Sequence, residues 1–170
     1  MNEGKSFDTA GTIIRVANVG DTKLEANANR IEVDKTAQIV RVYSDADQLL
    51  AAYPATIGSE DTPSPEGKHK VVAIAKHPTY TYDPKKLSFD GIKATEKFTI
   101  QPGPNNPVGL VWIDLNAPSY GIHGSPNPSK IRRQNSHGCV RLTNWDALAL
   151  ADAVDKGVTV DFVGAPSKAR

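Results

Sequence analysis

The segment Ser136-His137-Gly138-Cys139-Val140-Arg141-Leu142 contains the only cysteine of the chain, and Tyr120-Gly121-Ile122-His123-Gly124 lies shortly before it. The first segment predicts a tight turn that leads into a short strand, with the thiol of Cys139 at the turn. A cysteine and a histidine that meet in space, though not in sequence, provide a nucleophile and its general base. Together the two segments predict thiol chemistry.

The thiol needs activation, because a free cysteine has a pKa of about 8.5 and only a few per cent is thiolate at neutral pH. His123, His137 and Arg141 are the candidate bases or positive neighbours. If residues 139–142 are extended, Cys139 and Arg141 share one face of the strand. We therefore expect Arg141 beside the thiol in a cleft, where it could bind a substrate carboxylate through two hydrogen bonds.

The other face of this strand carries Val140 and Leu142, which we expect in the core. Gly138 allows a strained turn and a close approach of substrate to the backbone. Acyl transfer creates an oxyanion, which is stabilised by N–H donors about 3 Å away. The backbone N–H groups of Cys139, Gly138 and His137 are the candidate donors.

Other interpretations of these residues stay open on composition alone. A lone cysteine is often an inert buried side chain, a lone histidine is often structural, and Arg141 could be an ordinary surface residue. His123, His137 and Cys139 could also bind zinc, although a fourth ligand and a paired short spacing are missing.

The two segments resemble the signature of the YkuD-type L,D-transpeptidases, in which a histidine precedes a Ser/Thr-His-Gly-Cys block. Thr62-Pro63-Ser64-Pro65-Glu66-Gly67 is similar to the Thr/Pro-rich turn of this family, and Gly103-Pro104-Asn105-Asn106-Pro107-Val108-Gly109 to its Asn-Pro-x-Gly segment. The resemblance runs from about Asn29 to Val163. It implies a mostly-β, sandwich-like or barrel-like domain with one short helix after the catalytic cysteine.

The resemblance also implies roles for individual residues. Cys139 would be the nucleophile, His123 the general base oriented by the carbonyl of Gly124, and His137 and Gly138 would shape the oxyanion hole. The residues implied on the substrate side are Arg141, Ser136, Gly124 and Tyr120.

The implied activity is peptidoglycan L,D-transpeptidation without metal or organic cofactor. Cys139 would attack the stem-peptide bond before the terminal D-alanine, and an amine would resolve the thioester. The implied partners are donor and acceptor stem peptides, a lipoprotein as another acceptor, and carbapenems as inhibitors. Two alternatives remain: a thiol L,D-carboxypeptidase, in which water resolves the thioester, and a non-catalytic wall-binding module.

Length and composition fit one globular domain of ordinary size, with 170 residues, 39% hydrophobic and 23% charged. We expect an N-terminal extension over residues 1–28, a catalytic domain over 29–164 and a tail over 165–170. A net charge of +1 argues against a nucleic-acid binder, and no apolar run approaches the ~20 residues of a membrane span. The resemblance implies the bacterial periplasm or cell envelope, and since no signal peptide is visible, we expect that the sequence is trimmed or that the signal was removed.

Alternating apolar residues predict a series of short strands and a mostly-β fold. The expected strands lie at residues 12–19, 31–34, 39–43, 49–57, 70–75, 110–115, 120–123 and 158–163. One helix should follow Thr143, with Asp146 completing its cap, an apolar face of Trp145, Leu148, Ala149 and Ala151, and stop signals at residues 156–157. Tyr80 and Tyr82 alternate, and could either line a substrate groove or cover a surface hairpin.

Overall fold

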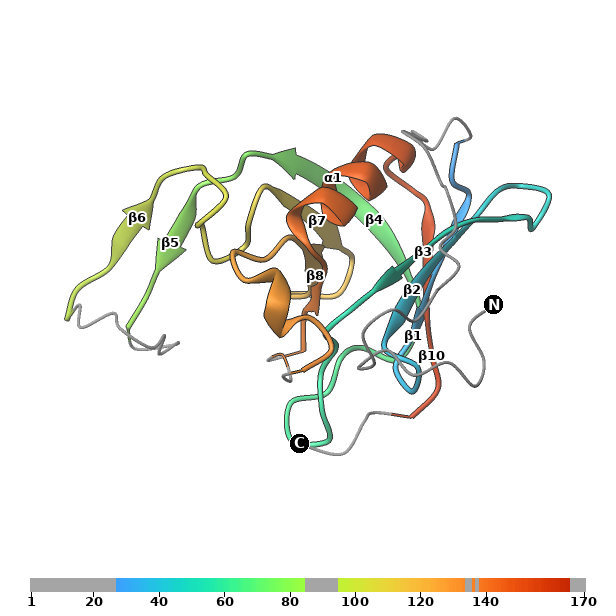
Figure 1. Ribbon diagram of the computed structural model, residues 1–170, viewed down its shortest axis with the longest axis horizontal. Coiled ribbons are helices and arrows are strands. Elements are labelled where there is room, and N and C mark those ends of the chain that lie inside the picture. The colour runs from blue at the N-terminus through green and yellow to red at the C-terminus, as the bar shows by residue number, and fades with distance from the viewer. Residues whose placement is uncertain (1–26, 85–94, 134–135, 137, 166–170) are drawn as a thin grey trace, which may run out of the picture.

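The computed structural model describes residues 27–84, 95–133, 136 and 138–165, and most of its regular structure is β (Figure 1). The strand expected at residues 12–19 lies outside the described residues. The elements in chain order are β1 (Arg30–Asp34), β2 (Ile39–Tyr43), β3 (Leu49–Pro54), β4 (Gly67–Lys76), β5 (Tyr80–Tyr82), β6 (Phe98–Ile100), β7 (Val111–Leu115), β8 (Gly121–His123), the 3₁₀ helix η1 (Pro128–Lys130), β9 (Val140–Arg141), α1 (Asn144–Ala153) and β10 (Thr159–Val163).

Eight strands form one sheet in the order β3-β2-β1-β10-β4-β7-β8-β9. The strands β1, β2 and β10 each bury every second residue, which confirms the alternation predicted for them. Their inward side chains belong to one hydrophobic core with those of β7 and α1. The last strand, β10, enters the sheet between β1 and β4, parallel to the first and antiparallel to the second.

The sheet curls until its two ends meet. Thr56, just after β3, forms an antiparallel bridge with Arg141 of β9, and the two residues exchange backbone hydrogen bonds of 2.8 and 2.9 Å. The mostly-β, barrel-like fold that the sequence indicated is therefore confirmed. The strands β5 and β6 pair separately and project from the main sheet (Figure 1).

The helix α1 begins as predicted, since Thr143 is its N-cap and accepts a hydrogen bond from the N–H of Asp146 at 3.2 Å. The predicted apolar face is partly wrong, because the Trp145 side chain is 62% exposed. The helix ends at Ala153, ahead of the stop signals at residues 156–157. Its buried residues are Ala147, Leu150, Ala151 and Ala153.

The correction for Trp145 has a geometric reason. Residues 147, 150, 151 and 154 repeat at the three- and four-residue spacing of one helix face. Trp145 precedes Ala147 by two positions, which corresponds to about 200° of helical rotation and places it on the other side. The helix packs this buried face on β7, β4 and β8 (Figure 1).

We expect Leu150→Ala to lower the free energy of unfolding by about 2–5 kcal/mol, because it leaves a cavity under α1 where Leu150 is fully buried. Trp145→Ala removes a larger side chain from the same helix, yet its effect should stay within about 0.5 kcal/mol, since Trp145 is exposed. Urea unfolding followed by circular dichroism measures both. Equal losses for the two variants would contradict this packing.

Candidate active site

The parallel pairing of β8 and β9 brings the two predicted segments together. Ile122 lies opposite Val140, and His123 lies opposite Arg141. Val140 and Leu142 are fully buried, as predicted, while Cys139 and Arg141 are only partly buried. The core therefore anchors one face of this short strand, and the thiol and the guanidinium stand on the other.

The imidazole of His123 is buried, and its Nδ1 lies 2.7 Å from the carbonyl oxygen of Gly124, as the resemblance implied. A carbonyl oxygen only accepts hydrogen bonds, so Nδ1 carries the proton and Nε2 keeps a free electron pair. Burial lowers the pKa of His123 to about 4; the charge of Arg141 acts in the same direction, and the Gly124 hydrogen bond opposes both. His123 is therefore neutral at pH 7 and can accept a proton at Nε2.

Trp112 supports this ring, and sequence reasoning missed it. On β7 it lies in register with His123, and the two rings stack with centroids 5.5 Å apart and planes 24° apart. Gly121 makes room for the indole, because a Cβ there would lie 2.7 Å from Trp112 Cζ2. Strand register, which the sequence did not reveal, creates this contact.

The backbone of Gly124 is held in place by close contacts between Gly109, Gly124 and the side chain of Asn144. A Cβ on Gly109 would lie 2.0 Å, and one on Gly124 2.3 Å, from Asn144 Oδ1. That oxygen accepts a hydrogen bond from the N–H of Leu110 at 3.0 Å, and Asn144 Nδ2 donates to the carbonyl of Pro104 at 3.1 Å. The first residue of α1 thus ties the 103–110 loop to the backbone that orients His123.

The thiol of Cys139 donates a weak hydrogen bond to the carbonyl of Ser119, with Sγ and O 3.6 Å apart. Burial raises its pKa, while a hydrogen bond from the Gly121 backbone and the charge of Arg141 partly oppose this. The resting site therefore holds a neutral thiol on the turn before β9 and a neutral imidazole on β8.

Tyr80 completes the group of ionisable side chains around the thiol. Burial raises the pKa of Tyr80, and the charges of Cys139 and Tyr82 raise it further, whereas Arg141 lowers it. Burial lowers the pKa of Arg141, while Cys139 and Tyr80 raise it. Of the two alternating tyrosines, Tyr80 faces the candidate site, and Tyr82 is buried against Phe98 with ring centroids 5.4 Å apart.

The turn before Cys139 is held by hydrogen bonds of the Ser136 hydroxyl. Ser136 is buried; its hydroxyl donates to the carbonyl of Cys139 and accepts the N–H of Gly138 at 3.2 Å. Tyr120 covers the turn, since a Cβ on Gly138 would lie 2.5 Å from its Cε1. The Gly138 N–H, one of the predicted oxyanion donors, is thus directed at Ser136, and His137 lies outside the described residues.

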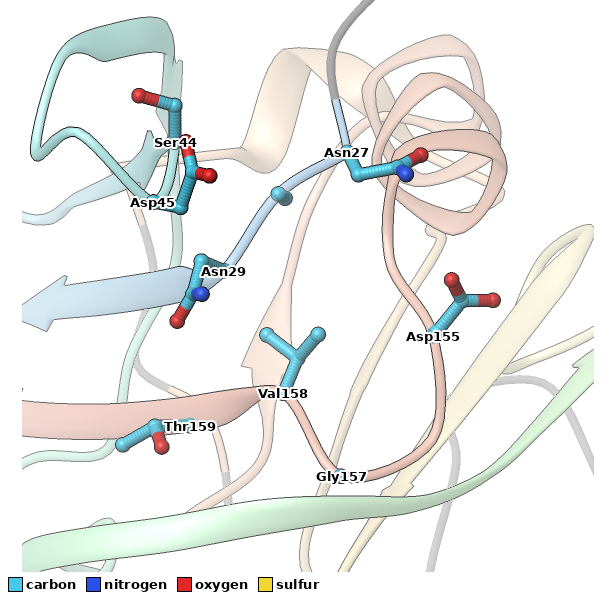
Figure 2. A pocket seen from close by; sticks show the side chains of 9 residues that line it. Asn27, Asn29, Ser44, Asp45, Asp155, Gly157, Val158 and Thr159 are labelled. Carbon is cyan, nitrogen blue, oxygen red and sulfur yellow. The ribbon is translucent and has the colours of Figure 1, made fainter.

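An open pocket of about 530 Å³ lies where β1 and β10 begin (Figure 2). None of the predicted site residues lines it. The lining residues are Asn27, Ala28, Asn29, Ser44, Asp45, Asp155, Gly157, Val158 and Thr159.

Within the described residues, no three His, Cys, Asp or Glu side chains gather to hold a metal ion, and no helix is long and apolar enough to cross a membrane.

We expect alkylation of Cys139 by iodoacetamide to accelerate with pH and to reach half its maximum above the ordinary pKa of cysteine, because burial keeps the thiol protonated. Arg141→Met should slow the reaction at pH 8, since loss of the cation raises the thiol pKa further. Arg133→Met, at an exposed arginine, is the matched control. A plateau in rate between about pH 5 and 7, as for a stable thiolate, would contradict the neutral pair.

We also expect His123 to make the fold acid-sensitive. Below about pH 6.5 the unfolded imidazole binds a proton, whereas the native one stays neutral down to about pH 4. The contribution of His123 to the free energy of unfolding is therefore complete above about pH 6.5. This contribution falls by about 3 kcal/mol as the pH drops to about 4.

Urea unfolding at pH 7 and pH 4.5 tests this difference. His123→Gln should lose less stability between the two pH values than the wild type does, while His77→Asn, at an exposed histidine, should behave like the wild type. Identical pH dependence for the wild type and His123→Gln would disprove the assignment.

Comparison with known proteins gives the same family as the signature. The family model of the YkuD L,D-transpeptidase catalytic domain matches residues 28–162. The protein YkuD of Bacillus licheniformis is 32% identical over 133 residues, which cover 78% of this chain and 64% of that protein. YqjB of Bacillus subtilis is 27% identical over 133 residues, 75% of this chain and 67% of that protein.

Solved structures share the fold at low sequence identity. An L,D-transpeptidase from Mycobacterium smegmatis has a TM-score of 0.58 at 21% identity and covers 81% of this chain and 59% of its own. A mutant of the Enterococcus faecium L,D-transpeptidase has a TM-score of 0.60 at 20% identity and covers 81% and 50%. This chain therefore spans less than two thirds of the Bacillus licheniformis relative and of both solved chains. Since the family model covers most of its length, the chain belongs to the YkuD L,D-transpeptidase catalytic domain family.

Proposed function

We propose that this chain is a peptidoglycan L,D-transpeptidase that acts through a thioester on Cys139. The observation that carries the proposal is the placement of His123 on the strand paired with β9, with its Nδ1 held by the Gly124 carbonyl. Its Nδ1–H is held by the Gly124 carbonyl and its pKa is about 4, so Nε2 is free to accept a proton. A neutral base on the strand beside a neutral thiol is suited to acyl transfer, because the thiol needs to lose its proton only as it attacks.

In the first half-reaction, His123 Nε2 takes the thiol proton while Cys139 Sγ attacks the carbonyl carbon before the terminal D-alanine. The carbonyl oxygen becomes an oxyanion. We expect the Cys139 N–H to donate a hydrogen bond to this oxyanion, because the Gly138 N–H already donates to Ser136. The C–N bond then breaks, and D-alanine leaves with the proton from His123. A thioester on Cys139 remains.

In the second half-reaction, an amine of an acceptor attacks the thioester. His123 removes the proton of the amine, the C–S bond breaks, and the sulfur recovers its proton. Resolution by water instead would make the chain an L,D-carboxypeptidase with the same residues.

Arg141 supports the donor site in this proposal. Its charge lies near Cys139, and a guanidinium binds a carboxylate through two hydrogen bonds. The terminal carboxylate of the donor peptide is the matching group. Tyr80 borders the same space, beside both Cys139 and Arg141, and Tyr120 and Ser136 shape the turn that the substrate meets.

The proposed partners are donor and acceptor stem peptides, with a lipoprotein amine as another acceptor, and the proposed location is the bacterial periplasm or cell envelope. A solved L,D-transpeptidase with a similar fold is in complex with imipenem. This supports carbapenems as inhibitors of the present chain.

Intact-protein mass spectrometry after incubation with a muropeptide tetrapeptide donor tests the proposal. The wild type should gain the mass of the donor minus D-alanine, and Cys139→Ala should gain none. His123→Gln should form the adduct about 10²- to 10⁴-fold more slowly, because the general base is lost. Addition of an acceptor amine should remove the adduct from the protein and yield a cross-linked product.

The alternatives give different results in the same experiment. Release of the shortened donor without incorporation of the amine would identify a carboxypeptidase. Folded wild-type protein with a reduced thiol that forms no adduct and releases no D-alanine would refute the proposed donor. If such protein still bound peptidoglycan, the wall-binding module would be the better explanation.

A further inference from the structure

Two hydroxyl groups from the loop of residues 58–64 donate hydrogen bonds to the backbone of residues 136–139, which form the nucleophile turn. Thr62 Oγ1 donates to the carbonyl of Ser136 at 2.7 Å, and Ser64 Oγ donates to the carbonyl of Gly138 at 2.6 Å. Each bond joins residues 74 positions apart, and a parallel bridge between Gly58 and Ser136 aligns the two segments. The conformation of the turn is therefore set partly by a distant loop.

Ser64 holds its position firmly. Its side chain is buried, and its hydroxyl accepts the N–H of Gly58 at 3.0 Å while it donates to Gly138. With its donor and an acceptor site both engaged, the hydroxyl has a fixed direction. The loop can fold back this tightly only over a glycine, because a Cβ on Gly58 would lie 2.4 Å from the carbonyl oxygen of Thr62.

The carbonyl that Ser64 holds shares a peptide unit with the N–H of Cys139. In a planar trans peptide the C=O and the N–H point in opposite directions. Since the Gly138 oxygen points at Ser64, the Cys139 N–H points away from the 58–64 loop. Gly138 adopts a φ of +102°, a conformation that favours glycine, and this lets the peptide take that orientation.

We infer that Ser64 is a positioning residue, which aims the backbone N–H of Cys139 at the oxyanion formed during acyl transfer. This inference rests on the proposed thioester chemistry but not on the identity of the natural substrate. Ser64 touches neither the thiol nor the reacting carbonyl in this role. It acts through one peptide plane, so its loss should harm reactions that form an oxyanion and spare those that do not.

Two small electrophiles separate these effects. Acylation by p-nitrophenyl acetate passes through an oxyanion: the Cys139 S–C bond forms, the C–O bond to p-nitrophenolate breaks, and the thiol proton leaves to His123. Alkylation by iodoacetamide displaces iodide at a saturated carbon and forms no oxyanion. Both reactions use the same sulfur atom, so a change that only makes the thiol less reactive should slow both.

We expect Ser64→Ala to slow acylation by about 10- to 100-fold, somewhat less than outright removal of an oxyanion donor, and to leave alkylation unchanged. Ser64→Thr, which keeps a hydroxyl, should recover acylation. Ser59→Ala is the matched control, because Ser59 is buried in the same loop and bonds to Thr62 rather than to the turn. It should leave the ratio of the two rates unchanged.

An equal fall in both rates for Ser64→Ala, or no fall in either, would overturn the inference. If Ser64→Ala does not fold, nuclear magnetic resonance of the wild type gives an independent test. A small aldehyde adds to Cys139 with formation of an S–C bond, and the thiol proton balances the charge on the new oxygen. The Cys139 amide proton should move downfield on addition, and an unchanged shift would refute its donor role.

These assays use no peptidoglycan, so the two proposals can fail separately. Acylation by the ester without any reaction with the muropeptide donor would reject the proposed substrate and leave the role of Ser64 intact. Reaction with both donors but no selective effect of Ser64→Ala would reject the role of Ser64 alone.

Discussion

The backbone hydrogen bonds between Thr56 and Arg141 close the curled sheet, and the geometry of the candidate site depends on them. β9 is only two residues long, and it is held between β8 on one side and Thr56 on the other. A strand this short has few ladder hydrogen bonds of its own. The buried side chains of Val140 and Leu142 add the packing that fixes its rotation, and with it the direction of the thiol.

Burial determines the charge state of the candidate site. It disfavours the charged forms of both His123 and Cys139, which leaves a neutral pair at rest. Arg141 brings a positive charge close to the thiol, although its own burial lowers its pKa. In the proposed acyl transfer, the charges would therefore form only in the presence of a substrate, in surroundings where hydrogen bonds and ions interact more strongly than in water.

Several glycines of the site serve close contact between backbone segments rather than mobility. Gly109 and Gly124 meet around the amide of Asn144, and Gly58 and Gly138 let the 58–64 loop lie against the nucleophile turn. In each case a Cβ would fall within about 3 Å of another atom, which real side chains almost never do. His123 and Cys139 consequently lie next to closely packed backbone, which is the kind of support that precise positioning of functional side chains requires.

The sequence alone determined the local features and the family. Alternation located the strands β1, β2 and β10, the Thr143 cap located the start of α1, and the segments that carry Cys139 and His123 identified the family. These features depend on neighbours in the chain, which a local pattern records. The tertiary structure alone decided that β10 lies between β1 and β4, that Trp145 faces outward, and which residues support the site: Ser64, Trp112, Tyr80 and Asn144. Their contacts join segments far apart in the sequence, and such pairings arise from the register and closure of the sheet, for which a local pattern carries no signal.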